Sequence, residues 1–148
     1  MLDEARKKAQ VADHMLTMTY PLVKDPKLLL AVLENVHKSM DYSIEEALTQ
    51  ARQKKEIPTY PNTAQGRFNA YQQHLARKNQ TPKELLRTIQ DVKETLEEHQ
   101  QSPVEFRRKE SFVICDESYK VRTLTEQTLK KHIKAAKELH THIQEKTR

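Results

Sequence analysis

The chain of 148 residues contains a single glycine, Gly66. Average glycine usage of about 7% would give about ten glycines in a chain of this length. Glycine supplies the positive φ angles of tight turns and allows close approach of the backbone to a ligand. A glycine-rich nucleotide-binding loop is therefore excluded, and a sandwich or barrel with many tight turns is disfavoured. These exclusions favour a mostly helical protein.

Prolines and capping residues mark the expected breaks between helices. They occur at Asp25-Pro26, residues 58–62, Thr81-Pro82 and Ser102-Pro103. Between these breaks, apolar residues recur at steps of three, four or seven, which places them on one face of a helix. The length fits one domain of about 100 to 200 residues. We therefore predict an all-α fold, an up-and-down bundle of about five helices, with residues 1–148 forming one domain.

The apolar face of the first predicted helix contains several small side chains. Ala5, Ala9 and Ala12 share this face, so that a neighbouring helix can approach it closely. Pro21 is expected to kink or end the helix, because proline removes a backbone donor and crowds the preceding turn.

The second helix is predicted to run unbroken over residues 27–56. Its continuous apolar stripe is favoured over the capping-box pattern that starts at Ser43, which would begin a separate helix. A third helix is expected from Ala64 to a stop at Asn79-Gln80. Thr81-Pro82 then begins a fourth helix, because a capping box there coincides with proline at the first helical position.

The stretch after the fourth helix has a different character. Ser102-Pro103-Val104-Glu105 is expected to cap a short helical turn. The β-type run Phe112–Cys115 and the later segment Tyr119–Val121 favour a small β-hairpin near residues 111–122. An irregular loop that covers one end of the bundle is the alternative. A last helix is predicted to start after Thr123 or Thr125.

Cys115 is the only cysteine, so an intramolecular disulfide is excluded and a reducing compartment is indicated. Within its apolar surroundings it is expected to be a buried small side chain and not a nucleophile. The longest apolar run spans residues 28–33, far shorter than the ~20 residues of a membrane-spanning helix. The N-terminus has no apolar segment typical of a secretory signal. We therefore expect a cytoplasmic protein that is not embedded in a membrane.

The sequence predicts no metal site and no cofactor. Glu34 and His37 match one half of the di-iron pattern of carboxylate bundles, which requires two such pairs and two further glutamates. A second Glu-x-x-His pair does not occur in the sequence. The helical phase of both residues, away from the apolar stripe, predicts that they face solvent. Cys115 has no second cysteine with which to form a closed zinc site.

Arg67 and His74 lie seven residues apart, two turns along one face of the third predicted helix. A guanidinium can stabilise a phosphorane-like charge while an imidazole moves a proton. The pair resembles the Arg-x(4–6)-His signature of HEPN domains, helical bundles that cut RNA without metal, usually across a dimer cleft. The resemblance implies a metal-independent ribonuclease with Arg67 and His74 as catalytic residues. HEPN motifs commonly place a polar residue after the arginine, whereas Phe68 follows here, and about one such spacing is expected by chance in a chain like this.

Positive charge is concentrated in the last third of the chain. Residues 102–148 carry eleven Lys and Arg against seven Asp and Glu, whereas the whole chain has a net charge of +5. The candidate nucleic-acid-binding or anion-binding residues are Lys130, Lys134 and Lys137, on one stripe of the last helix, together with Arg107, Arg108 and Lys109. Lys120 and Arg122 would join this surface if the hairpin folds back against the helix. Such a surface neutralises phosphates without choosing a sequence. An ordinary solvated helix face is the favoured alternative, because aromatic residues for base stacking are few.

Two segments, residues 13–29 and 102–115, carry a further resemblance. They are similar to a group of small, uncharacterised archaeal helical-bundle proteins. The resemblance implies a cytosolic prokaryotic protein and brings no activity with it.

These observations favour a binding or scaffolding module over an enzyme. The alanine-lined face of the first helix and the long second helix offer surfaces for a protein partner or a homodimer. The alternatives are a HEPN-like ribonuclease that uses Arg67 and His74, and a phosphate-backbone binder that uses the basic C-terminal third.

Overall fold

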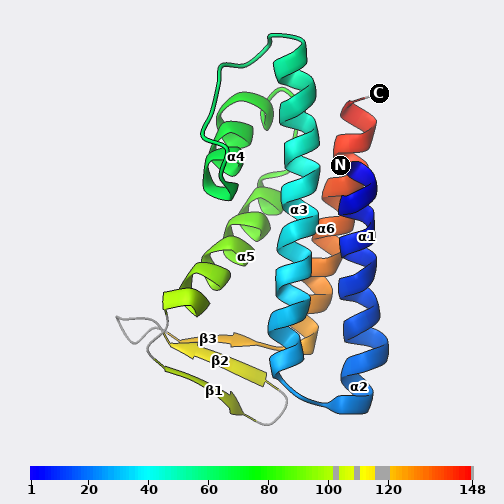
Figure 1. The fold of residues 1–148 in the computed structure, drawn as a ribbon, viewed down its shortest axis with the longest axis vertical. Coiled ribbons are helices and arrows are strands. Elements are labelled where there is room, and N and C mark those ends of the chain that lie inside the picture. The colour runs from blue at the N-terminus through cyan, green and yellow to red at the C-terminus, as the bar shows by residue number, and fades with distance from the viewer. Residues whose placement is uncertain (102–103, 109–110, 116–120, 148) are drawn as a thin grey trace.

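The structure, a computed structural model, describes residues 1–101, 104–108, 111–115 and 121–147, with 101 and 104–108 described as backbone only. Five helical segments and a small sheet make up these residues (Figure 1). The helices are α1 (Leu2–His14), which continues through a π-helical turn, η1 (Met15–Thr19), into α2 (Tyr20–Val23); α3 (Lys27–Gln53); α4 (Ala64–Ala70), which continues into η2 (Tyr71–Leu75); α5 (Lys83–Gln101); and α6 (Glu126–Lys146). The strands are β1 (Val104–Arg108), β2 (Ser111–Cys115) and β3 (Val121–Leu124). The prediction of an all-α bundle with a small hairpin is confirmed.

Helix α3 is the centre of the bundle. It packs against α1 and α6 on one side, and against α4 and α5 on the other (Figure 1). Leu29, Leu33, Met40 and Leu48 of α3 are fully buried along its length. The helix is continuous through Ser43, so the apolar stripe was the correct signal and the local capping box was not. Packing of one long apolar face outweighs the weaker preference of a capping motif for a helix end.

The alanine face of α1 lies inside the molecule. Ala5, Ala9 and Ala12 are buried against α3 and α6. The Ser39 hydroxyl of α3 donates a hydrogen bond to the Ala5 carbonyl at 2.7 Å, as the close approach of two helices permits. This face is therefore covered within the chain and is not available to a partner, contrary to the expectation from sequence.

The first helical segment ends as expected close to Pro21, but two residues after it. The π-helical turn η1 precedes Pro21, and Val23 is the last residue of α2. Lys24 then adopts a left-handed conformation with φ of 51°. The Lys27 amide donates to the Asp25 carboxylate at 3.0 Å, which stabilises the turn that leads into α3.

The only glycine of the chain is explained by a close contact with the loop before α4. The Gly66 amide donates to the Thr63 hydroxyl at 3.0 Å, the N-cap of that helix. A Cβ atom at Gly66 would lie 2.2 Å from the Pro61 carbonyl oxygen. A side chain is therefore excluded by the path of the loop and not by an unusual φ angle.

The helix that begins at Ala64 becomes π-helical at Tyr71 and ends at Leu75, earlier than the predicted stop at Asn79.

The predicted hairpin is formed by β2 and β3. Strand β1 pairs with β2 and completes a three-stranded antiparallel sheet with the order β1-β2-β3. The expected helical turn at Ser102–Glu105 is wrong, because Val104 begins β1 and pairs with Cys115. The ladder to β2 and the β-favouring Val and Phe of this segment outweigh its local capping signal. Phe112, Val113 and Ile114 of β2 are buried. The sheet contacts the ends of α3 and α5, which gives the small hairpin the support it needs.

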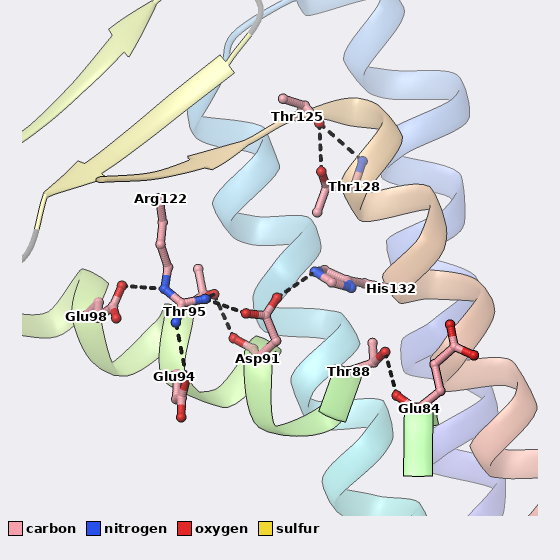
Figure 2. A network of polar contacts seen from close by, with 10 residues as sticks. All are labelled: Glu84, Thr88, Asp91, Glu94, Thr95, Glu98, Arg122, Thr125, Thr128 and His132. Carbon is pink, nitrogen blue, oxygen red and sulfur yellow. Dashed lines mark hydrogen bonds and ion pairs between the residues drawn. The ribbon is translucent and has the colours of Figure 1, made fainter. Parts of the chain in front are cut away.

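An ion-pair cluster fastens the sheet to α5 (Figure 2). Arg122 of β3 contacts Asp91 through Nη1, the Glu94 carboxylate through Nη2 at 3.1 Å and the Glu98 carboxylate through Nε at 2.6 Å. His132 of α6 approaches Asp91 from the opposite side, with 3.7 Å between Nε2 and Oδ2. We call these five residues the Arg122 cluster. Arg122 is therefore neutralised within the fold and does not join a basic surface.

Candidate functional site

The structure places Arg67 in a paired, mostly buried position. Its Nε and Nη2 donate to the two oxygens of Asp41 on α3, at 2.8 and 2.7 Å. Nη1 donates to the Asn62 side chain at 2.9 Å. The hydrogen bonds to Asp41 raise the pKa of Arg67. The guanidinium thus joins α4 to α3 and to the preceding loop.

His74 lies on the π-helical turn η2 and is half-buried. The helix changes from α to π between Arg67 and His74, and a π turn has more residues per turn than an α turn. The spacing that predicts a shared face therefore no longer applies. In the part of the chain that the structure describes, no hydrogen bond or ion pair joins the two side chains. A catalytic role for this pair stays a prediction.

The lysine stripe of α6 is exposed but partly neutralised. Lys130 pairs with Glu126 at 3.4 Å, and Lys137 pairs with Asp13 at 2.8 Å. Lys134 lines a shallow groove between α6 and the start of α5. The remaining predicted anion-binding residues are Arg107 and Arg108, whose backbone lies in β1, and Lys109, which lies outside the described residues. Anion binding by this surface stays a prediction.

A pocket of about 410 Å³ opens between α3, α4 and α5. Its wall is rich in polar and titratable side chains and contains two apolar ones. It is formed by Glu34, His37 and Lys38 of α3, Ala64 and Gln65 of α4, and Lys93, Leu96, Glu97, His99 and Gln100 of α5. The volume lies within the range of about 300 to 1,000 Å³ that is typical of small-molecule sites.

Lys93 is the unusual residue of this pocket, because it is only 5% exposed. Its Nζ lies 5.6 Å from the centre of the Phe68 ring, at the distance of a cation–π contact. The Glu97 carboxylate lies 3.8 Å away, beyond hydrogen-bond range. An ammonium has three donors, and a buried charge ordinarily has hydrogen-bonded partners. Among the described residues, these are the only ion-pair, hydrogen-bond or cation–π contacts of the Lys93 ammonium.

The sequence contains a signal for Lys93 that our sequence reasoning missed. Leu85, Ile89 and Lys93 follow one another at steps of four, so the lysine continues an apolar row of α5. Leu85 and Ile89 are buried, and Lys93 is buried with them. A lysine in such a row is a candidate for a buried charge, because lysine is almost never fully buried without a partner.

His37 is half-buried in the pocket wall, so the expectation that it faces solvent is wrong. Burial lowers its pKa, and the charges of Lys93 and Arg67 lower it further. The negative charges of Asp41 and Glu97 act in the opposite direction. The Arg67–Asp41 pair and the pocket therefore form one electrostatic neighbourhood around His37.

The pocket is connected to the sheet through His99. The His99 ring meets the Phe112 ring of β2 edge to face, with 6.4 Å between their centres. Among the described residues, no three metal-binding side chains lie together in a way that could hold an ion.

Within the described residues, no helix is both long and apolar enough to cross a bilayer. The chain matches no protein-family model, and comparisons with curated proteins and with solved structures give no significant match. The resemblances to archaeal helical-bundle proteins and to HEPN domains stay predictions.

Proposed function

We propose that this protein is a binding module that takes a small organic ligand in the pocket between α3, α4 and α5. The observation that carries this proposal is the burial of Lys93 in the pocket wall with an incomplete set of partners. Keeping the ammonium of a residue that is only 5% exposed is unfavourable for folding, because most of its hydration is lost and no hydrogen bond from the described part of the protein replaces it. A ligand group that supplies the missing acceptors makes this placement favourable.

The rest of the pocket wall suits this role. Leu96 and Ala64 offer apolar contact, and Gln65 and Gln100 offer amide donors and acceptors. A lining of a few polar groups among apolar ones is typical of small-molecule sites, since the polar groups fix the orientation of the ligand.

The ribonuclease alternative has less support from the geometry. Arg67 donates through three of its nitrogens to Asp41 and Asn62, so a phosphate would have to compete with an ion pair already formed. The phosphate-backbone alternative is weakened in the same way, because Lys130 and Lys137 already face carboxylates.

The binding proposal is tested by NMR titration of the full chain with a panel of small carboxylates, amines and neutral amides. We expect at least one compound to shift the ring resonances of His37 and His99, which line the pocket. His132 of the Arg122 cluster serves as the internal control and should not move. A panel that leaves His37 and His99 unmoved at millimolar concentration contradicts the proposal.

Self-association is a second candidate function, favoured by the exposed end of the first helical segment. Met18, Leu22 and Val23 are 59%, 87% and 59% exposed. We propose that a second copy of the chain covers them, because pairing through one shared patch buries it on both copies at once. Sedimentation analysis should show a dimer that Leu22→Lys dissociates. Val121→Lys, at an apolar position on β3 that is 61% exposed, is the control, and a monomeric wild-type chain contradicts this candidate.

A further inference from the structure

We propose that the ligand of this pocket carries a carboxylate, which replaces Glu97 beside the Lys93 ammonium. The inference rests on the proposed function of the pocket and names the chemical class of its ligand.

The contacts of Lys93 indicate where the ligand group binds. One side of the ammonium is occupied by the face of the Phe68 ring. The Glu97 carboxylate stays 3.8 Å away, and its side chain is 54% exposed. An exposed carboxylate loses little when it turns into water, because water solvates its charge. A ligand oxygen at hydrogen-bond distance from Nζ therefore gains a charge-assisted bond that Glu97 does not make.

The charges of the pocket wall favour a monoanion. The formal charges of Lys38 and Lys93 balance those of Glu34 and Glu97. His37 adds no positive charge at neutral pH, because burial lowers its pKa below the ordinary value. A carboxylate brings one negative charge into this balanced wall, whereas a phosphate monoester brings about 1.5 to 2. A wall with no net charge does not offset the greater desolvation cost of the larger charge.

The remainder of the pocket favours an apolar body attached to the carboxylate. Leu96 and Ala64 lie in the same wall as Lys93. A ring or short alkyl group against them leaves water, which favours binding in proportion to the apolar surface buried. Benzoate has this combination of groups and is a suitable probe.

The test compares three compounds of similar shape on the full chain. Benzoate carries the carboxylate, benzamide replaces it by a neutral amide, and phenyl phosphate carries a phosphate monoester. NMR titration followed at His37 and His99 gives the three dissociation constants. We expect benzoate to bind about tenfold or more tightly than benzamide, as one hydrogen bond to a charged group implies. Benzoate should also bind more tightly than phenyl phosphate.

Variants assign the effect to Lys93. Lys93→Met should weaken benzoate binding about tenfold or more and leave benzamide unchanged, whereas Lys38→Met, on the exposed rim of the same pocket, should change benzoate affinity less than about threefold. Glu97→Gln should tighten benzoate binding, since the competing carboxylate is gone. The Glu97 variant keeps the test decisive even if Lys93→Met does not fold.

The outcomes separate the inference from the proposed function. Equal affinity for benzoate and benzamide, or unchanged benzoate affinity in Lys93→Met, overturns the inference while the pocket remains a binding site. Tighter binding of phenyl phosphate than of benzoate overturns the choice of a carboxylate. If none of the compounds of the NMR panel moves the pocket resonances, the proposed function itself fails.

Discussion

Helix α5 carries two charged clusters, one on each side of its buried face, and the cation is paired very differently in the two. In the Arg122 cluster, Asp91, Glu94 and Glu98 meet one guanidinium that enters from β3 (Figure 2). In the pocket, Lys93 faces one carboxylate of its own helix at 3.8 Å and an aromatic ring. The guanidinium is surrounded by acceptors, whereas the ammonium is not.

This difference separates a structural role from a binding role. A guanidinium of a strand that is paired through all three of its nitrogens with carboxylates of a helix holds the two elements together. A buried cation with few partners contributes little to stability and retains the capacity to bind an acceptor. Removal of Arg122 should therefore lower stability, whereas removal of Lys93 should lower ligand affinity and change stability little.

The largest effect is expected when the saturated cluster is broken. Arg122→Met leaves three carboxylates beside one another with no cation between them, so their mutual repulsion acts on the folded state. We expect the free energy of unfolding to fall by about 2 kcal/mol, less than for a fully buried pair because the cluster is partly exposed. Urea unfolding of the variant and of wild type measures this difference in free energy. Lys130→Met, which removes an exposed pair within one helix, is the control and should change stability by less than about 0.5 kcal/mol.

A change of less than about 0.5 kcal/mol for Arg122→Met would show that the cluster does not hold the sheet. In that case the contrast between the two sides of α5 would have no structural basis.

The second effect disturbs only the pocket side of the comparison. Gly66→Ala forces a Cβ atom against the Pro61 carbonyl oxygen, so α4 or the preceding loop must move. We expect a loss of about 1 to 2 kcal/mol in urea unfolding, as for other overpacked sites. Shifted NMR resonances should include Gln65 in the pocket wall and exclude Arg122. Gln73→Ala, at an exposed position further along the same segment, is the control, and equal stability of Gly66→Ala and wild type would contradict the contact.

The third effect is a pH dependence to which both clusters contribute. Burial lowers the pKa of His37 in the pocket and of His132 in the Arg122 cluster. The unfolded chain therefore binds protons at these histidines near pH 6.5 and the folded chain only at lower pH. Stability should fall as the pH is lowered from 7 through this window, because the unfolded state then binds more protons.

The two histidines can be separated by replacing each with glutamine. His132→Gln and His37→Gln should each reduce the loss of unfolding free energy between pH 7 and pH 5. Gln73→Ala, an exposed substitution that removes no titratable group, is the control and should leave the slope unchanged. An unaltered slope in both test variants would contradict the burial of these rings.

The sequence predicted local features of the fold better than features that depend on distant partners. Apolar periodicity and proline caps located the long helix α3 and the starts of α4 and α5, because these signals lie within one segment. Strand β1 was missed because Val104 becomes a strand residue by pairing with Cys115, a contact that no local motif encodes. The π-helical turn Tyr71–Leu75 was also not predicted.

The candidate site was predicted only in fragments. Arg67 was predicted to act together with His74, whereas its hydrogen-bond partners in the structure are Asp41 and Asn62. His37 was assigned to solvent because helical phase alone does not show that α5 covers that side of α3. Lys93 was passed over because a single charged residue within an apolar row is easily read as part of an exposed face.

The most direct test of the contrast between the two clusters is to measure stability and affinity together in Lys93→Met. Urea unfolding should give a free energy within about 1 kcal/mol of wild type, because an apolar side chain replaces a poorly paired buried charge. Benzoate affinity, measured by NMR titration of the same sample, should fall about tenfold or more. A loss of stability as large as that of Arg122→Met, with unchanged benzoate affinity, would show that Lys93 holds the fold and does not bind a ligand.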